Sequence, residues 1–335
     1  MGPMPLVDLH VHLELPVLGA QWRKRVQRFF LGTVEQESPN GSACVRGSFR
    51  LYGLTCYQTF VTDPLGARAR LFKFLEEFPR DTASLILSSA DLDLSALSHP
   101  SRREAFLLTV ESLRYLQDPT DLRALWDYGV RSLQPIHFLD TPWGRSSKEG
   151  LLPQTPGGLT GLGREMLAEM ARLGFILDLA HMNFKTAEEC LAGYPGAVMC
   201  SHTGLHEIRP SARNLTADLA REIFNRGGAV GVTCWRQLLG TETGTGGRDA
   251  LREGWTRAIC ATAAALAALA PGARVAVGSD RGAPIRAPGW LYSEDNLREM
   301  ETCLAGYGWG RERFEEFLWG SGAAFLREAL AGSSA

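Results

Sequence analysis

Residues 175–202, FILDLAHMNFKTAEECLAGYPGAVMCSH, contain one complete strand–helix–strand unit. The apolar runs at 175–181 and 197–202 have the length and composition of buried strands, and residues 186–194 have a helical pattern. Two strands joined by a helix pair in parallel within one sheet. Each run ends in a histidine, His181 or His202, so the unit predicts two imidazoles side by side at one edge of a sheet.

The same alternation of short apolar runs and longer helical patterns extends along the whole chain, which is typical of parallel βαβ units. Eight runs are predicted strands, at residues 6–12, 51–61, 105–111, 130–137, 175–181, 197–202, 229–235 and 274–280. Six helices are predicted between and after them, at residues 119–128, 162–173, 186–194, 217–226, 249–269 and 293–304. The pattern therefore predicts an α/β fold, a (β/α)8 TIM barrel with extra C-terminal helices after residue 280.

Composition limits the other functional classes. The 335 residues are 45% hydrophobic, which suits a single barrel domain over residues 1–335. Lys and Arg number 35 against 37 Asp and Glu, with no basic run, so we expect no nucleic acid partner. The Ala-rich segment at 258–270 is shorter than the roughly 20 residues of a membrane span, and residues 1–6 lack a secretory pattern. Seven scattered cysteines favour reduced thiols, so we expect a cytoplasmic protein that does not contact a membrane.

Chemistry-bearing side chains gather where the predicted strands end. They are His10, His12, Glu111, His137, His181, His202 and Asp280. An isolated histidine beside an apolar strand is more often a satisfied core residue than a ligand. The shared placement of these residues favours a metal site, because the carboxyl ends of barrel strands converge on one cavity.

Individual motifs leave alternatives open. His10 and His12 are two residues apart on a strand, so both imidazoles face the same way and can bind one cation. Glu111 is either a metal ligand, able to bridge two cations, or the cap of the next helix. Asp280 is either an acid/base carboxylate or a helix N-cap. Arg213 has the planar fork that binds a carboxylate through two hydrogen bonds, and its alternative is an ordinary surface arginine.

Several of these motifs together resemble the membrane (renal) dipeptidase family, peptidase family M19, a branch of the amidohydrolase-like barrels. The resemblance covers most of the chain and is most specific in residues 129–143, which include His137-Phe-Leu-Asp-Thr-Pro-Trp143. Its further segments are Gly158-Leu-Thr160, Glu165-Met166, Met170-Ala-Arg-Leu-Gly174, Asp178-Leu-Ala-His181, Ser201-His202, Arg213-Asn214 and Gly278-Ser279-Asp280.

The resemblance implies a zinc-dependent dipeptidase with two Zn²⁺ ions per chain. Glu111 matches the bridging carboxylate, His10 a ligand of the first metal, and His181 and His202 the ligands of the second. His137 matches the histidine that contacts the scissile group, and Asp280 the catalytic acid/base. Arg213 matches the group that binds the dipeptide carboxylate, and Asn214 and Tyr57 are further candidate substrate-binding residues. The substrate would be a small dipeptide-like molecule, and a homodimer is a candidate assembly.

Departures from the family pattern qualify this expectation. His12 stands where the family usually has Asp, so the first metal site loses one negative charge. Ser112-Leu113-Arg114 replaces a Gly-rich turn, and Arg281 replaces an aromatic residue. The expected mechanism is attack on the amide by a hydroxide that bridges the metals, with Asp280 protonating the departing amine. The alternatives are an amidohydrolase acting on an N-acyl amino acid, a lactone or a related amide, and a non-catalytic zinc-binding barrel.

Overall fold

The computed structural model describes residues 5–12, 50–57, 64–77, 84–92, 105–150, 152–240, 248–280, 291 and 293–331. Within these residues the strands form one sheet in the order β2-β1-β9-β8-β7-β6-β5-β4-β3, and all their pairings are parallel. A further pairing between β2 and β4 joins the sheet into a closed ring of eight strands, with the short β3 beside β4. The predicted (β/α)8 barrel is therefore confirmed. The strands are β1 (Leu6–His12), β2 (Arg50–Tyr57), β3 (Ser84–Leu85), β4 (Ala105–Glu111), β5 (Val130–Gln134), β6 (Ile176–Asp178), β7 (Val198–Thr203), β8 (Ala229–Val232) and β9 (Arg274–Val277).

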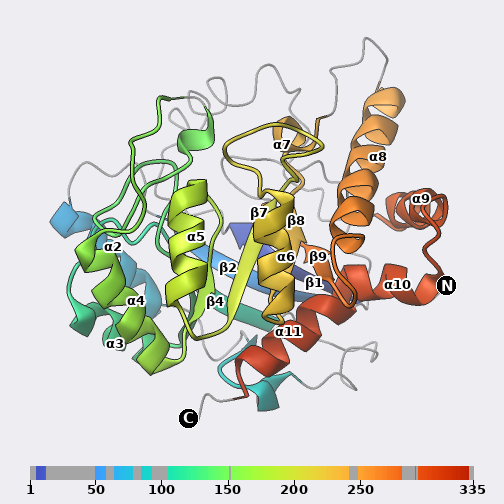
Figure 1. Ribbon diagram of the computed structural model, residues 1–335. Helices are drawn as coiled ribbons and strands as arrows, with labels where there is room; N and C mark the ends of the chain where they lie inside the picture. The colour runs from blue at the N-terminus through green and yellow to red at the C-terminus, as the bar shows by residue number, and fades with distance from the viewer. Residues whose placement is uncertain are drawn as a thin grey trace.

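The helices surround this sheet (Figure 1). They are α2 (Pro64–Glu77), α3 (Pro119–Asp127), α4 (Gly161–Leu173), α5 (Phe184–Gly193), α6 (Ala217–Asn225), α7 (Arg236–Leu239), α8 (Arg248–Ala267), α9 (Glu294–Ala305), α10 (Arg311–Glu315) and α11 (Ser321–Ala329), with short helical turns at η1 (Ser89–Asp91), η3 (Lys148–Gly150) and η4 (Glu316–Gly320). All six predicted helices are present, as α3, α4, α5, α6, α8 and α9. No helix in the described part of the chain combines the length and apolar character needed to cross a membrane.

Local side-chain caps set several helix boundaries. The Thr160 hydroxyl accepts a hydrogen bond from Gly163 N at the start of α4, and Gly174 ends that helix at φ 89°, as predicted. Asn183 caps α5 by accepting from Thr186 N, so this helix begins two residues before the predicted start at Thr186. These caps therefore fix the first residues of α4 and α5.

The strands are buried on both faces. Leu108, Leu133 and Leu177 belong to the larger core cluster, which includes the inner sides of the surrounding helices. Their neighbours Leu107 and Ile176 belong to a second cluster. This division follows from the two-residue period of a strand, whose successive side chains point to opposite faces.

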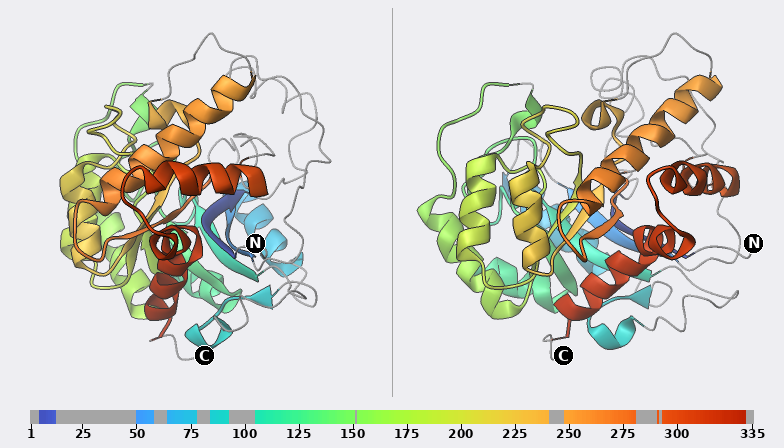
Figure 2. Two further views of the ribbon diagram at one scale, coloured as in Figure 1. Left: turned by 90° about the vertical axis from the view of Figure 1, so that its right-hand side faces the viewer. Right: turned by 45° about the vertical axis from the view of Figure 1, so that its right-hand side comes forward.

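The C-terminal part of the chain packs against the first and last strands of the barrel through η4 and α11. Helix α11 contacts β1 and β9. Its residues Phe325 and Leu326 join Val7 and Leu9 of β1 in the second cluster. Figure 2 shows the C-terminal helices, in red, brought forward by turning the molecule. The η4 turn, which precedes α11, also contacts both β1 and β9, the first and last strands of the barrel sequence.

Four strands end three residues before their predicted ends, and the one predicted at 229–235 ends at Val232. Residues 58–61 of the strand predicted at 51–61 lie outside the described residues. The strands expected at 130–137, 175–181 and 274–280 end at Gln134, Asp178 and Val277, so His137, His181 and Asp280 each lie three residues beyond their strand. His181 and Asp280 adopt positive φ values of 66° and 55°, which no strand residue can have. The chain turns sharply at these positions and directs the side chains back over the barrel.

Two glycines allow neighbouring strands to approach closely around Ser201. A Cβ atom built on Gly231 would lie 1.9 Å from the Ser201 carbonyl oxygen, and one built on Gly278 would lie 1.8 Å from the same atom. Any side chain here would displace the backbone of β7, because the contact is with a main-chain atom. Glycine is therefore required on both sides of the strand that carries His202.

We expect Gly231→Ala to lower the free energy of unfolding by about 3 kcal/mol, the upper part of the range for overpacked cores. Gly193→Ala is the matched control, because a Cβ at this last residue of α5 meets nothing within 4 Å. Urea denaturation measures both variants. Equal free energies of unfolding for the two variants would show that β7 can shift to accept the added methyl group without loss of stability.

Candidate metal centre

Two groups of buried ligand-type side chains lie above the barrel strands. One contains His10, His202 and Asp280, and the other Glu111, His181 and His202. In each group the ligand atoms all lie within 4.8 Å of one another. His202 belongs to both groups, so the two candidate ion sites are adjacent. The structure thus brings together five of the residues predicted from strand ends.

The distances within these groups suit nitrogen and oxygen ligands directed at shared cations. His181 Nε2 lies 2.9 Å from His202 Nε2 and 3.4 Å from Glu111 Oε1. His10 Nε2 lies 3.9 Å from both Glu111 Oε1 and Asp280 Oδ1. Imidazole nitrogen and carboxylate oxygen are ligands that zinc prefers. Glu111 Oε1 thus lies within 4 Å of a histidine of each group, and it also accepts a hydrogen bond from Gln134 Nε2 at 2.6 Å.

Buried aspartates fix the strands that carry these ligands. Asp8 accepts hydrogen bonds from the backbone nitrogens of His10, at 3.3 Å, and Ser279, at 2.9 Å. Asp178 accepts in the same way from Ala180 N, at 3.1 Å, and Ser201 N, at 2.9 Å. Each carboxylate therefore links the end of its own strand to the neighbouring strand, in both cases beside a metal-ligand candidate.

Ser201 joins two of the candidate ligands on their outer sides. Its hydroxyl lies 3.2 Å from His10 Nδ1 and 2.8 Å from His202 Nδ1. A hydroxyl oxygen has two lone pairs and can accept from both N–H groups at once. Both imidazoles would then present bare Nε2 atoms, as metal ligation requires.

His137 and Arg213 lie next to the two groups without belonging to them. His137 Nε2 is 3.7 Å from Glu111 Oε1, and the His137 ring meets the His181 ring edge-on at 4.4 Å between centroids. Arg213 is 3% exposed, and its Nη2 donates to the His202 carbonyl oxygen. Its Nε forms an ion pair with Glu149 Oε2 at 3.4 Å, and its buried Nη1 has no hydrogen-bond partner, which leaves that donor available for an anionic ligand.

Asn214 differs from Arg213, because its amide is engaged by the protein backbone. Both amide hydrogens are donated, to the carbonyl oxygens of Arg209 and Leu238, and its oxygen accepts from Gly204 N. The side chain holds the loop that carries Arg213. The side chains of His12 and Tyr57, at the ends of β1 and β2, lie outside the described residues, as does Arg281.

The sequence interpretation missed one buried acidic residue, Glu149. Its Oε1 lies 2.5 Å from His181 Nδ1, and its Oε2 lies 3.4 Å from Arg213 Nε. Nothing in the surrounding Lys148-Glu149-Gly150 distinguishes it from a solvated loop charge. The tertiary fold alone brings this loop over the barrel.

Burial governs the protonation of this region. It lowers the pKa of His181 well below its ordinary value, and the nearby Arg213 cation lowers it further. The imidazole is therefore neutral and able to bind a metal. Burial also raises the pKa of Glu149 to about 7, with the Arg213 cation opposing the rise and Asp280 adding to it.

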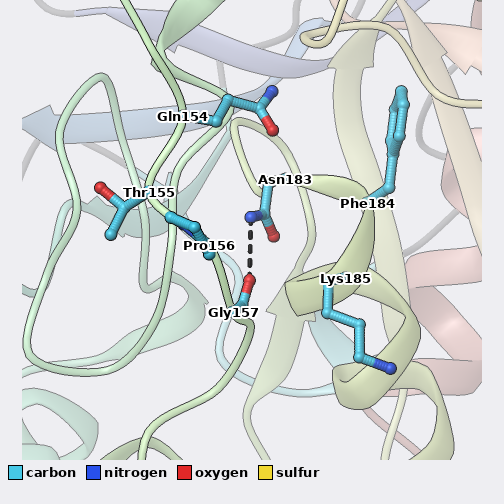
Figure 3. A pocket seen from close by; sticks show the side chains of 7 residues that line it. All are labelled: Gln154, Thr155, Pro156, Gly157, Asn183, Phe184 and Lys185. Carbon is cyan, nitrogen blue, oxygen red and sulfur yellow. Dashed lines mark hydrogen bonds between the residues drawn. The ribbon is translucent and has the colours of Figure 1, made fainter.

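A separate pocket lies between the loop at residues 152–157 and the start of α5 (Figure 3). Its volume is about 400 Å³, and Asn183 Nδ2 donates across it to the Gly157 carbonyl oxygen at 3.1 Å. Its lining residues are Gln154, Thr155, Pro156, Gly157, Asn183, Phe184 and Lys185. None of them belongs to the two ligand groups, so this pocket is not part of the candidate metal centre.

A closed parallel barrel with histidines and carboxylates above its strands defines the class of metal-dependent hydrolase barrels. The family model for membrane dipeptidase (peptidase family M19) matches residues 68–320, most of the chain. The chain therefore belongs to the membrane dipeptidase family, as its sequence motifs predicted.

Two curated relatives share part of this sequence. An uncharacterized dipeptidase, C965.12, of Schizosaccharomyces pombe is 30% identical over 138 residues, which are 40% of this chain and 33% of that protein. A Klebsiella pneumoniae protein described as an uncharacterized protein in the pqqA 5' region is 32% identical over 115 residues, 33% of this chain and 42% of that protein. The matched regions thus span less than half the length of each relative.

Solved structures share the fold over nearly the whole chain. The probable dipeptidase PvdM of Pseudomonas aeruginosa superposes with a TM-score of 0.74 at 15% identity, covering 99% of this chain and 96% of that one. A metallopeptidase of Rhodobacter sphaeroides superposes with a TM-score of 0.68 at 18% identity, covering 98% and 99%. At these identities the similarity supports the fold.

Because His202 Nε2 lies in both ligand groups but can bind only one ion, we expect His202→Ala to lower bound zinc by about one ion per chain. His206→Ala is the matched control, since His206 contacts Phe184 and the Ser211 carbonyl outside both groups. Elemental analysis after gel filtration in micromolar zinc measures the content. Equal zinc content in both variants would contradict the shared site.

Proposed function

We propose that this protein is a zinc-dependent dipeptidase that hydrolyses the amide bond of small dipeptides. The observation that carries the proposal is the sharing of His202 by two buried ligand groups, completed by Glu111 and Asp280. The family membership supports it. So does the Rhodobacter sphaeroides metallopeptidase of the same fold, which is liganded with a phosphinate mimic of the dipeptide L-Ala-D-Ala.

In this proposal His10 and Asp280 face one zinc ion, His181 and His202 hold the other, and Glu111 is shared. His12 is assigned to the first ion from the sequence motif. When bound, the ions supply Lewis acidity, which makes water more acidic and polarises the substrate carbonyl. The donor set fits this metal, because the imidazoles are buried and their Nε2 atoms converge.

The residues around the metal centre have distinct tasks in the proposed reaction. Asp280 moves a proton from the attacking water to the departing amine, because its carboxylate faces His10 across 3.9 Å at the rim of the site. His137 donates to the carbonyl oxygen as negative charge develops there. Arg213 binds the carboxylate of the dipeptide through its buried Nη1, which has no hydrogen-bond partner in the protein, and this limits substrate length. Asn214 holds the Arg213 loop, and Tyr57 is a further candidate for substrate contact.

Purified protein with zinc should hydrolyse at least one member of a panel of L-L and L-D dipeptides faster than N-acyl amino acids. We expect Asp280→Asn to lower kcat about 10²- to 10⁴-fold, because the proton transfer is lost, while zinc content is unchanged. Asp218→Asn is the control, since its side chain is 94% exposed on α6. Loss of zinc together with activity would make Asp280 a ligand instead of the acid/base, and near-normal kcat would rule out either role.

Arg213→Met should lower kcat/KM for a dipeptide about 10- to 100-fold, the value of charge-assisted hydrogen bonds. The C-terminal amide of the same dipeptide has no carboxylate for Arg213, so its kcat/KM should change little. Arg209→Met, an exposed arginine in the same loop, is the control. If both substrates lost activity equally, Arg213 would not be the carboxylate-binding group.

A further inference from the structure

Glu149 occupies a turn whose backbone is unfavourable for its residue type. Lys148 and Glu149 have consecutive positive φ values, 49° and 56°. A left-handed conformation costs a residue with a Cβ atom about 1–2 kcal/mol. Glycine would be the usual choice, and Gly150 follows directly. A strained non-glycine turn persists where surrounding contacts require that particular side chain.

Three groups hold this turn against Asp140. The Asp140 carboxylate accepts from Ser146 N at 2.9 Å and from the Thr155 hydroxyl at 2.5 Å, and Lys148 Nζ lies 3.2 Å from it. Partial burial by itself would raise the pKa of the Asp140 carboxyl, and these bonds together outweigh it, so the pKa is lowered from its ordinary value. The turn is therefore anchored on its outer side, independently of the metal centre.

On its inner side the same turn is attached to His181 twice. Ser147 N donates to the His181 carbonyl oxygen at 2.8 Å, and Glu149 Oε1 lies 2.5 Å from His181 Nδ1. The Glu149 side chain is 3% exposed, so contacts with the protein replace the hydration of its carboxylate. A carboxylate that accepts from Nδ1–H fixes the imidazole tautomer and leaves Nε2 bare. That Nε2 points at His202 and Glu111.

Arg213 completes the arrangement from the opposite side. Its Nε lies 3.4 Å from Glu149 Oε2, and both side chains are almost fully buried. The pairing offsets the charge of a carboxylate that would otherwise be isolated in the protein interior. The Arg213 cation therefore lies beside one Glu149 oxygen while the other oxygen faces His181.

We infer that Glu149 is a positioning residue for zinc binding. It orients His181 toward the metal through Nδ1 and is itself held by Arg213 and by the anchored turn at residues 146–149. Glu149 does not belong to either ligand group among the described residues, so it acts through His181 and not by direct ligation. The link to catalysis rests on the proposed function, whereas the effect on zinc binding does not.

The test compares Glu149→Gln with wild type by competition between the protein and a chromophoric chelator for zinc. We expect the dissociation constant of one zinc ion to rise about 10- to 100-fold, the usual effect of removing a carboxylate behind a metal-ligating histidine. The metal-free variant should melt no lower than metal-free wild type, since a buried charge has been removed. Glu188→Gln is the control, because this α5 side chain is 57% exposed.

Glu149→Asp keeps the charge but shortens the side chain, and an intermediate loss of zinc affinity is expected. Zinc affinity is measured on Glu149→Asp instead if Glu149→Gln fails to fold. Unchanged zinc affinity in the folded variant would overturn the inference, as would a loss of stability in the metal-free state alone, which marks a structural role. If wild type hydrolyses no dipeptide while Glu149→Gln still binds zinc weakly, the proposed function fails and the positioning role stands.

Discussion

Backbone pairing between Leu51–Tyr57 of β2 and Ala105–Glu111 of β4 closes the parallel sheet. In a closed parallel barrel the carboxyl ends of all strands meet around one opening, whatever their distance in sequence. This places the Ser201 hydroxyl 3.2 Å from His10 Nδ1, although the residues are 191 positions apart. The candidate metal centre depends on that closure, because no local segment contains more than two of its members.

The candidate metal centre is buried, so its polar and charged groups lose their hydration. Polar and charged groups removed from water are stable when they have close partners. Asp8 and Asp178 satisfy this condition, since each accepts from one backbone nitrogen of its own segment and one of the neighbouring segment. Glu149 satisfies it with an imidazole and a guanidinium. The same contacts that offset desolvation also fix the orientation of the imidazoles, so stability and metal binding rest on common residues.

Backbone strain is concentrated around the same opening. Described non-glycine residues with positive φ are Ser112, Lys148, Glu149, His181 and Asp280. All of them follow a strand end or lie in the loop that leads from β5 to α4. Strain of this kind persists where the surrounding structure over-determines the conformation. Here it lets the chain leave a strand and turn a side chain back over the barrel within a few residues.

The sequence by itself determined the barrel, its eight strands and the six predicted helices, because periodic burial and turn residues are local properties. The family followed from the resemblance of its motifs. The sequence also predicted that His10, Glu111, His181, His202 and Asp280 lie close together, since parallel strands necessarily end at one edge, and the structure brings these side chains together. Tertiary structure decided where strands 130–137, 175–181 and 274–280 end, because sharp turns and not residue preference set those limits. It alone revealed Glu149 and the backbone-bound amide of Asn214. Both depend on which distant loops pack together, and that packing leaves no periodic signal in the chain.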